Sequence, residues 1–118
     1  MIAVIFEVFA ANGRKDDYLE HAALLRSELE CMDGFISVER FQSLTDPDKL
    51  LSLSFWRDEE AVAGWRACAG HRGAQSAGRR GIFRDYRLRV AAVSRDYGMS
   101  ERREQAPADT RAIYDVPV

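Results

Sequence analysis

The predicted first strand, Ile2–Ala10 (IAVIFEVFA), is apolar on both of its faces. β-Branched and aromatic residues favour extended backbone, and successive side chains of a strand point to opposite faces of its sheet. One face carries Val4 and Phe6, while the other carries Ile5 and Phe9. Because neither face suits water, this strand must lie in a sheet that is covered on both sides.

The next hydrophobic patterns predict a helix and then a hairpin. Apolar residues recur every three or four positions in 15–32, which predicts an amphipathic helix, and the DGF segment at 33–35 ends it in a tight turn. Alternation predicts strands in 35–44 and 50–56. The proline-containing turn at 45–49 (TDPDK) joins these two strands.

A second helix and a fourth strand complete the pattern. The helix begins after Arg57 behind acidic residues, kinks near Gly70 and continues in a weaker, glycine-containing piece. Alternation from Asp85 predicts the fourth strand. The order β-α-β-β-α-β predicts an α+β, ferredoxin-like fold with an antiparallel sheet and both helices on one face. We expect a homodimer packed sheet to sheet to cover the other face.

The length of 118 residues fits one folded unit. We expect a domain at 1–98 and a C-terminal arm at 99–118, where periodicity is lost and two prolines occur. Ile113, Tyr114 and Val116 would dock this arm onto the body or onto a partner subunit.

Composition excludes several classes of protein. A formal net charge of -2 gives no reason to expect nucleic-acid binding. The N-terminus lacks a basic segment before its apolar run, and no stretch approaches the length of a membrane span, so we expect a cytoplasmic protein. Cys31 and Cys68 are far apart in sequence, which predicts reduced thiols. Nine arginines between Arg57 and Arg95 can bind an anionic substrate, or form a solvated face that pairs with acidic residues elsewhere.

Four segments carry a resemblance to a known family: DGFISVERFQS, LLSLSFWRDEEAVAGWR, HRGAQ and IFRDYRLRVA. In this order the chain resembles the antibiotic biosynthesis monooxygenase family of dimeric α+β barrel proteins, over about Ile2 to Tyr97. The resemblance implies a homodimer with a ligand cavity between sheet and helices in each subunit. It also implies activities such as oxidation of aromatic polyketides or quinols by dioxygen without metal or flavin, or haem degradation.

Cofactor-free oxygenation needs an apolar pocket and a base that deprotonates an electron-rich aromatic ring. Glu7, a carboxylate in an apolar strand, and His71 are the candidate bases. Trp65 would stack on the substrate ring, and Gln75, four residues after His71, would orient a carbonyl. The remaining candidates for substrate binding are Ile5, Phe9 and His21.

Each candidate also has a structural interpretation. Trp65 would serve as core packing, and His71 would cap a helix or face solvent. Glu7 would pair with Arg87 or Arg89 of the fourth strand.

We expect no cofactor and no metal. Members of the haem-degrading branch of the family resemble one another in an asparagine on the first strand and in a tryptophan and a histidine on the second helix. In this chain the tryptophan corresponds to Trp65, but the asparagine and histidine positions fall on Glu7 and Gln75. These departures argue against haem ligation. A non-haem iron site from His21, His71 and Glu7 is formally possible but would join distant positions.

The first functional hypothesis is a cofactor-independent monooxygenase that oxidises a small aromatic compound, a hydroquinone or polyphenol, with dioxygen. The second is a non-catalytic dimeric domain that binds a small hydrophobic ligand or serves in a stress response, with Glu7 in an ion pair and His71 facing solvent. The third is an isomerase or dechlorinase-like relative on the same fold. The fold cannot separate these hypotheses, because one architecture hosts unrelated functions.

Overall fold

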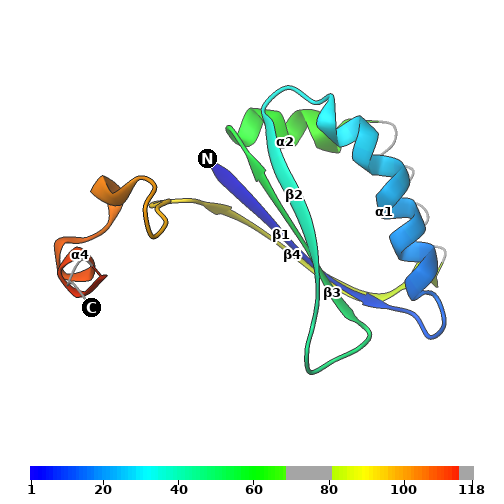
Figure 1. Cartoon of the computed structure of the whole chain (residues 1–118). Helices are drawn as coiled ribbons and strands as arrows, with labels where there is room; N and C mark the ends of the chain where they lie inside the picture. Colours follow the sequence, from blue (N-terminus) through cyan, green and yellow to red (C-terminus); the bar gives the residue numbers. More distant parts are fainter. Residues whose placement is uncertain (69–80, 115–118) are drawn as a thin grey trace.

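The computed structural model describes residues 1–68 and 81–114, with side chains as far as residue 111 (Figure 1). His71, Gln75 and the second piece of the predicted second helix therefore lie outside the described residues. The described elements of the body are β1 (Ile2–Ala10), α1 (Lys15–Glu30), β2 (Phe35–Gln42), β3 (Lys49–Trp56), α2 (Glu59–Arg66) and β4 (Phe83–Ala92).

The four strands form one antiparallel sheet in the order β2-β3-β1-β4. The first and last strands of the body are therefore neighbours, as the split βαβ arrangement requires. Helices α1 and α2 both lie over one face of this sheet (Figure 1), which we call the inner face. These features confirm the predicted α+β, ferredoxin-like fold, while pairing with a second copy stays a prediction.

Alternation in β1 decides which side chains meet the helices. Val8 is fully buried with Tyr18 of α1, and Val4 packs against the cluster around Trp56, so the even-numbered positions face inward. Ile5, Glu7 and Phe9 consequently belong to the opposite, outer face.

Trp56 is the largest fully buried side chain of the described residues, with 1% of its surface exposed. Its indole N–H donates to Ser54 Oγ at 3.0 Å. The rings of Trp56 and Phe35 pack edge to face, with 5.4 Å between their centroids. Leu29 of α1 and Val62 of α2 complete this part of the core, so the residue joins the sheet to both helices.

A charged corner connects the end of α1 with the start of α2. Gly34 adopts a φ of 82°, a left-handed conformation that ends the α1 turn, and its carbonyl accepts a hydrogen bond from the Arg57 N–H at 2.8 Å. The Arg57 guanidinium donates to both carboxylate oxygens of Asp33, at 3.2 and 3.0 Å, and to Asp58 at 3.1 Å. Asp58 also caps α2, because it accepts from the Ala61 N–H at 2.9 Å.

This corner predicts a small, pH-dependent contribution to stability. The hydrogen bond from Arg57 lowers the pKa of Asp33, while the bond from the Ala61 N–H, followed by that from Arg57, lowers the pKa of Asp58. A folded-state pKa below the unfolded one stabilises the protein above the unfolded value, about 3.9 for an aspartate, and this contribution is lost as the pH falls through the folded pKa. We expect the melting temperature of the wild type to fall more steeply than that of Arg57→Met between pH of about 5 and about 2.

Thermal unfolding followed by circular dichroism at stepped pH values measures this difference. Arg26→Met is the matched control, because Arg26 forms an exposed pair with Glu30 on α1, outside the corner. The effect will be modest, since the corner is solvent-exposed. If the melting temperatures of the wild type and Arg57→Met fall in parallel with pH, the stabilisation attributed to the Arg57 contacts is contradicted.

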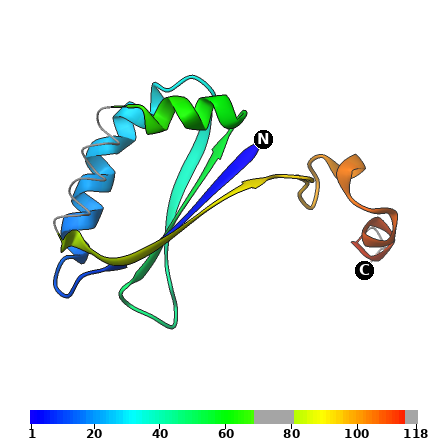
Figure 2. The same cartoon turned by 180° about the vertical axis from the view of Figure 1, so that it is seen from behind.

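The C-terminal segment leaves the body along the extension of β4. It contains a short 3-10 helix, η2 (Arg103–Gln105), and the helix α4 (Ala108–Tyr114), which the sequence pattern did not predict. Figures 1 and 2 show both helices away from α1, α2 and the sheet. Val116 and the side chains of Ile113 and Tyr114 lie outside the described residues, so the docking of this arm stays a prediction.

Within the described part of the chain, no helix combines the length and apolar character that crossing a lipid bilayer requires.

Candidate functional site

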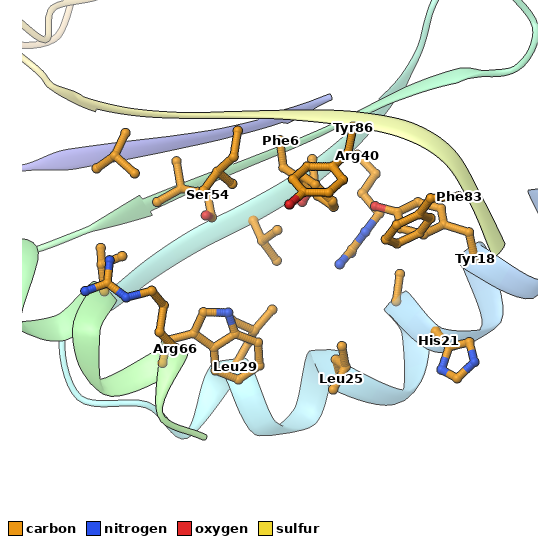
Figure 3. A pocket seen from close by; sticks show the side chains of 18 of the residues that line it. Phe6, Tyr18, His21, Leu25, Leu29, Arg40, Ser54, Arg66, Phe83 and Tyr86 are labelled. Atoms are coloured by element: carbon orange, nitrogen blue, oxygen red, sulfur yellow. The ribbon is translucent and has the colours of Figure 1, made fainter. Parts of the chain in front are cut away.

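A cavity of about 520 Å³ lies between the inner face of the sheet and the helices (Figure 3). Pockets for small ligands usually range from about 300 to 1,000 Å³. The cavity therefore has the size of a small-molecule site, and most of the side chains that line it are apolar or aromatic.

Two small residues on β3 create part of this space. Ser52 and Ser54 occupy inner positions between Leu50 and Trp56, whose larger side chains are buried in the two core clusters. Ser52 lies opposite Phe6 of β1 in the sheet. A serine fills much less volume than a leucine or tryptophan. The two serines therefore leave space over the middle of β3, between the larger side chains of Leu50 and Trp56.

The helices provide the opposite wall. A stripe of α1 side chains, spaced three or four residues apart, faces the cavity: Tyr18, Ala22, Leu25 and Leu29. The sequence periodicity predicted this stripe. Val62 and Trp65 extend the wall along α2. This wall is rigid, because Tyr18, Leu29 and Val62 are also buried members of the core clusters.

One end of the cavity is built from aromatic rings. Phe6 meets Phe83 at 6.0 Å and Tyr86 at 5.7 Å between centroids, and Tyr18 meets Phe83 at 5.6 Å. All three pairs have steep interplanar angles, the edge-to-face geometry that aromatic pairs prefer. The same side chains line the cavity, so a planar or cyclic ligand would meet ring edges and faces here.

Trp65 lies both in the cavity wall and in the core packing, the two alternatives that the sequence left open. It lines the cavity, and its ring stacks on Trp56 with 6.3 Å between centroids and 30° between planes. One face is therefore committed to core packing while the residue also contributes to the cavity wall. His21, on α1, lines the cavity as well.

The structure places Glu7, Ile5 and Phe9 on the outer face of the sheet, away from this cavity, so it does not bring them together with Trp65 and His21, and their functional roles stay predictions. These three side chains share the outer face of β1, whereas Val4 and Phe6 on the inner face line the cavity. The physical reason is the two-residue period of a strand, which sends neighbouring side chains to opposite faces.

Glu7 forms two ion pairs on the outer face. Its carboxylate lies 3.2 Å from Arg89 Nη1 on β4 and 3.6 Å from Lys49 Nζ on β3. The pairing with Arg89 is the structural interpretation considered from the sequence. These contacts hold the carboxylate beside two cations and on the far side of the sheet from the cavity.

Arg40 is a cavity residue that sequence reasoning did not select. It lies on β2 opposite Ser52 and projects into the cavity beside Tyr18 (Figure 3). Its Nε is buried and has no hydrogen-bond partner among the described residues. Arg40 shares its face of β2 with the cavity residue Val38. A charged residue at an inner strand position was thus the available signal.

Burial raises the pKa of the Tyr18 hydroxyl, and the charge and hydrogen bonding of Arg40 partly oppose this shift. Tyr18 therefore stays protonated at neutral pH and can donate a hydrogen bond. In the part of the chain that the structure describes, no three His, Cys, Asp or Glu side chains come together as a metal site requires. Cys31 and Cys68 are free thiols.

Comparison with known proteins agrees with this architecture. Residues 1–77 match the model of the antibiotic biosynthesis monooxygenase family. The chain is similar to the jasmonate monooxygenase ABM of Pyricularia oryzae, with 44% identity over 116 residues, which is 98% of this chain and 54% of the relative. The chain thus spans about half the length of this relative.

Solved structures show the same fold at low sequence identity. A candidate antibiotic biosynthesis monooxygenase from Deinococcus radiodurans has a TM-score of 0.76 and 14% identity, covering 83% of this chain and 97% of its own. A protein from Mycobacterium tuberculosis has a TM-score of 0.75 and 14% identity, covering 82% and 98%. With the family model matching well over half of the sequence, the chain belongs to the antibiotic biosynthesis monooxygenase family.

Proposed function

We propose that this chain is a monooxygenase that transfers one atom of dioxygen to a small, largely apolar compound bound between the sheet and the helices and releases the other atom as water. A hydroquinone or polyphenol itself supplies the two electrons that form this water, whereas a substrate without such a group requires a two-electron reductant. The observation that carries the proposal is the cavity of about 520 Å³, lined mainly by apolar and aromatic side chains on rigid elements. The family and a relative named as a monooxygenase support the reaction type.

Two substrate classes fit the cavity and can be compared directly. A hydroquinone or polyphenol would pack against the aromatic end, and its deprotonated form can transfer an electron to dioxygen without metal or flavin. Jasmonate, the substrate in the relative's name, is a carboxylate with a non-aromatic ring and is also small enough for this volume. We expect the protein to discriminate between them, because the polar side chains placed among the apolar ones of the lining fix the orientation of a ligand.

The positions of the described residues support a base other than Glu7 at this cavity. Glu7 lies on the outer face in two ion pairs, whereas the cavity is on the inner face. His21 lines the cavity, and an imidazole can accept a proton near neutral pH. We therefore expect His21 to accept the proton of a phenolic substrate, while Trp65 and the aromatic end hold its ring.

Oxygenation with ¹⁸O₂ tests this function. Purified, metal-stripped protein is incubated with a panel of hydroquinones and with jasmonate, the latter with and without NADPH as a two-electron reductant, against protein-free autoxidation blanks. We expect protein-dependent oxygen uptake and a product that is heavier by one ¹⁸O atom. If the reaction requires an added metal or flavin, the assignment as a monooxygenase stands and the cofactor-free mechanism is overturned. Uptake no faster than the blanks for both classes would favour the second hypothesis, a binding domain, which Glu7 in an ion pair also fits.

A pair of α1 variants connects the activity to the cavity. Ala22→Phe adds a ring to a residue that lines the cavity, whereas Leu24→Phe adds one at a residue that is 67% exposed. We expect Ala22→Phe to lower kcat/KM at least about tenfold, which corresponds to about 1.4 kcal/mol of lost transition-state stabilisation, and Leu24→Phe to leave it unchanged. Equal effects would place the reaction elsewhere. Circular dichroism checks that both variants are folded.

A further inference from the structure

Arg40 brings a permanent positive charge into a cavity that is otherwise mainly apolar. Arginine side chains carry a positive charge in proteins. The Arg40 Nε is shielded from solvent and lacks a hydrogen-bond partner among the described residues. A buried donor without a partner is unfavourable by about 1–3 kcal/mol, and more when it is charged. Such a group calls for an acceptor outside the described residues.

No carboxylate of the described residues neutralises this charge. The ion pairs within 4.0 Å that the structure records join other cations, and none includes Arg40. The other arginines on the cavity lining have different environments. Arg66 is exposed at the end of α2, where water solvates its charge, and Arg84 lies over the Phe9 ring at 5.6 Å. Arg40 hydrogen-bonds the Tyr18 hydroxyl, but it is the lining arginine whose buried Nε has no hydrogen-bond partner among the described residues and whose charge faces no carboxylate within 4.0 Å.

From these contacts we infer that Arg40 is the anchor for a carboxylate group on the compound that occupies the cavity. The inference rests on the proposed function, because it concerns the ligand of the same site. Arg40 would act as a positioning residue: it fixes one end of the compound, and the apolar and aromatic lining holds the rest (Figure 3). A planar guanidinium matches a carboxylate well, and such charge-assisted bonds are the stronger ones in proteins.

The surroundings favour a single carboxylate over a more highly charged anion. The donors of the cavity lining near Arg40 include the Tyr18 phenol and the hydroxyl of Ser52, which lies opposite Arg40 in the sheet, and the Arg40 guanidinium is the one cation among these three. A phosphate dianion would need further cations and donors, whereas a monocarboxylate is satisfied by two or three hydrogen bonds. The cavity therefore fits an amphipathic acid, with its charged end at β2 and its apolar body toward the tryptophans at the other end.

Binding can be measured separately from turnover. The chain has two tryptophans, Trp56 and Trp65, and both line the cavity, so quenching of their fluorescence reports its occupancy. The probes are jasmonate, decanoate and 4-phenylbutyrate, each compared with its uncharged methyl ester under anaerobic conditions. The proteins are wild type, Arg40→Gln, and Arg26→Gln as a matched control that removes an arginine from the exposed side of α1.

We expect the wild type to bind at least one acid at least about tenfold more tightly than its ester. Arg40→Gln should raise the Kd of that acid by about tenfold or more and leave the Kd of the ester within a factor of about three, while Arg26→Gln changes neither. A merely structural role would weaken acid and ester together. Thermal unfolding adds a second readout, since the acid should raise the melting temperature of the wild type but not that of Arg40→Gln.

Several results would overturn the inference. These are equal binding of acids and esters by the wild type, failure of all three acids to bind, or an acid preference that survives in Arg40→Gln. Loss of the preference in Arg66→Gln instead would place the anion at α2. The outcome is independent of the proposed reaction: an acid anchored by Arg40 but never oxygenated leaves the inference standing and refutes the monooxygenase. Oxygenation of a carboxylic acid with kcat/KM unchanged in Arg40→Gln does the reverse.

Discussion

Trp56→Ala is expected to lower the free energy of unfolding by about 3–5 kcal/mol, the range for truncation of a large buried aromatic side chain. Trp56 is 1% exposed, packs edge-to-face with Phe35 and stacks with Trp65. Its removal leaves a hole between the sheet and both helices and takes away the donor to Ser54 Oγ. Since domains of this size are stable by about 5–15 kcal/mol, the variant would keep only part of its stability.

Urea unfolding followed by circular dichroism measures this loss without relying on tryptophan emission. Leu44→Ala is the matched control, because Leu44 is fully exposed in the turn between β2 and β3 and its truncation should change stability by less than about 0.5 kcal/mol. A loss below about 1 kcal/mol in Trp56→Ala would mean that the site collapses around the missing ring. Such a small loss would show that the Trp56 ring is not needed to hold the sheet and the two helices apart.

Gly34→Ala is expected to destabilise the protein by about 2–5 kcal/mol through two separate effects. The backbone at Gly34 has a φ of 82°, where a Cβ is unfavourable by about 1–2 kcal/mol. A Cβ built at this position would also lie 2.5 Å from the Cβ of Ala61 in α2. This contact is too short for two carbon atoms, so the start of α2 must move away from the end of α1, at a further cost of about 1–3 kcal/mol.

Gly13 supplies a control that separates the two effects. It has a similar φ of 75°, but a Cβ there would meet nothing within 4 Å. Gly13→Ala should therefore show the backbone effect alone, about 1–2 kcal/mol. Adding Ala61→Gly to Gly34→Ala should recover the contact energy, so the double variant should be more stable than the single contributions predict. Equal losses for Gly13→Ala and Gly34→Ala in urea unfolding would show that α2 adjusts without cost.

The position of Glu7 illustrates what local reasoning misses about a site. A carboxylate within an apolar strand looked like a buried base, and its neighbours Ile5 and Phe9 supported an apolar environment. The register of the sheet instead brings Arg89 from β4 and Lys49 from β3 beside it, on the outer face. These partners are more than forty residues away in sequence, so composition near Glu7 carried no information about them.

Arg40 shows the complementary case. The alternation in β2 already put it on the same face as Val38, and the periodicity of α1 put Tyr18 on the stripe that faces the sheet. That the two meet in a cavity depends on how far α1 lies from β2 and on the small Ser52 between them. Distances between elements result from the packing of all their side chains, and no single segment encodes them.

The sequence by itself determined the order of helices and strands, the antiparallel ferredoxin-like arrangement and the inner stripe of α1. These properties follow from local periodicity, because a period of 3.6 or 2 residues dictates which side chains share a face. Only the tertiary structure decided which face of β1 meets the helices, that a cavity remains above Ser52 and Ser54, and that Arg40 enters it without a carboxylate partner among the described residues. Those properties depend on contacts between residues far apart in the chain, which close packing establishes only when the whole fold is assembled.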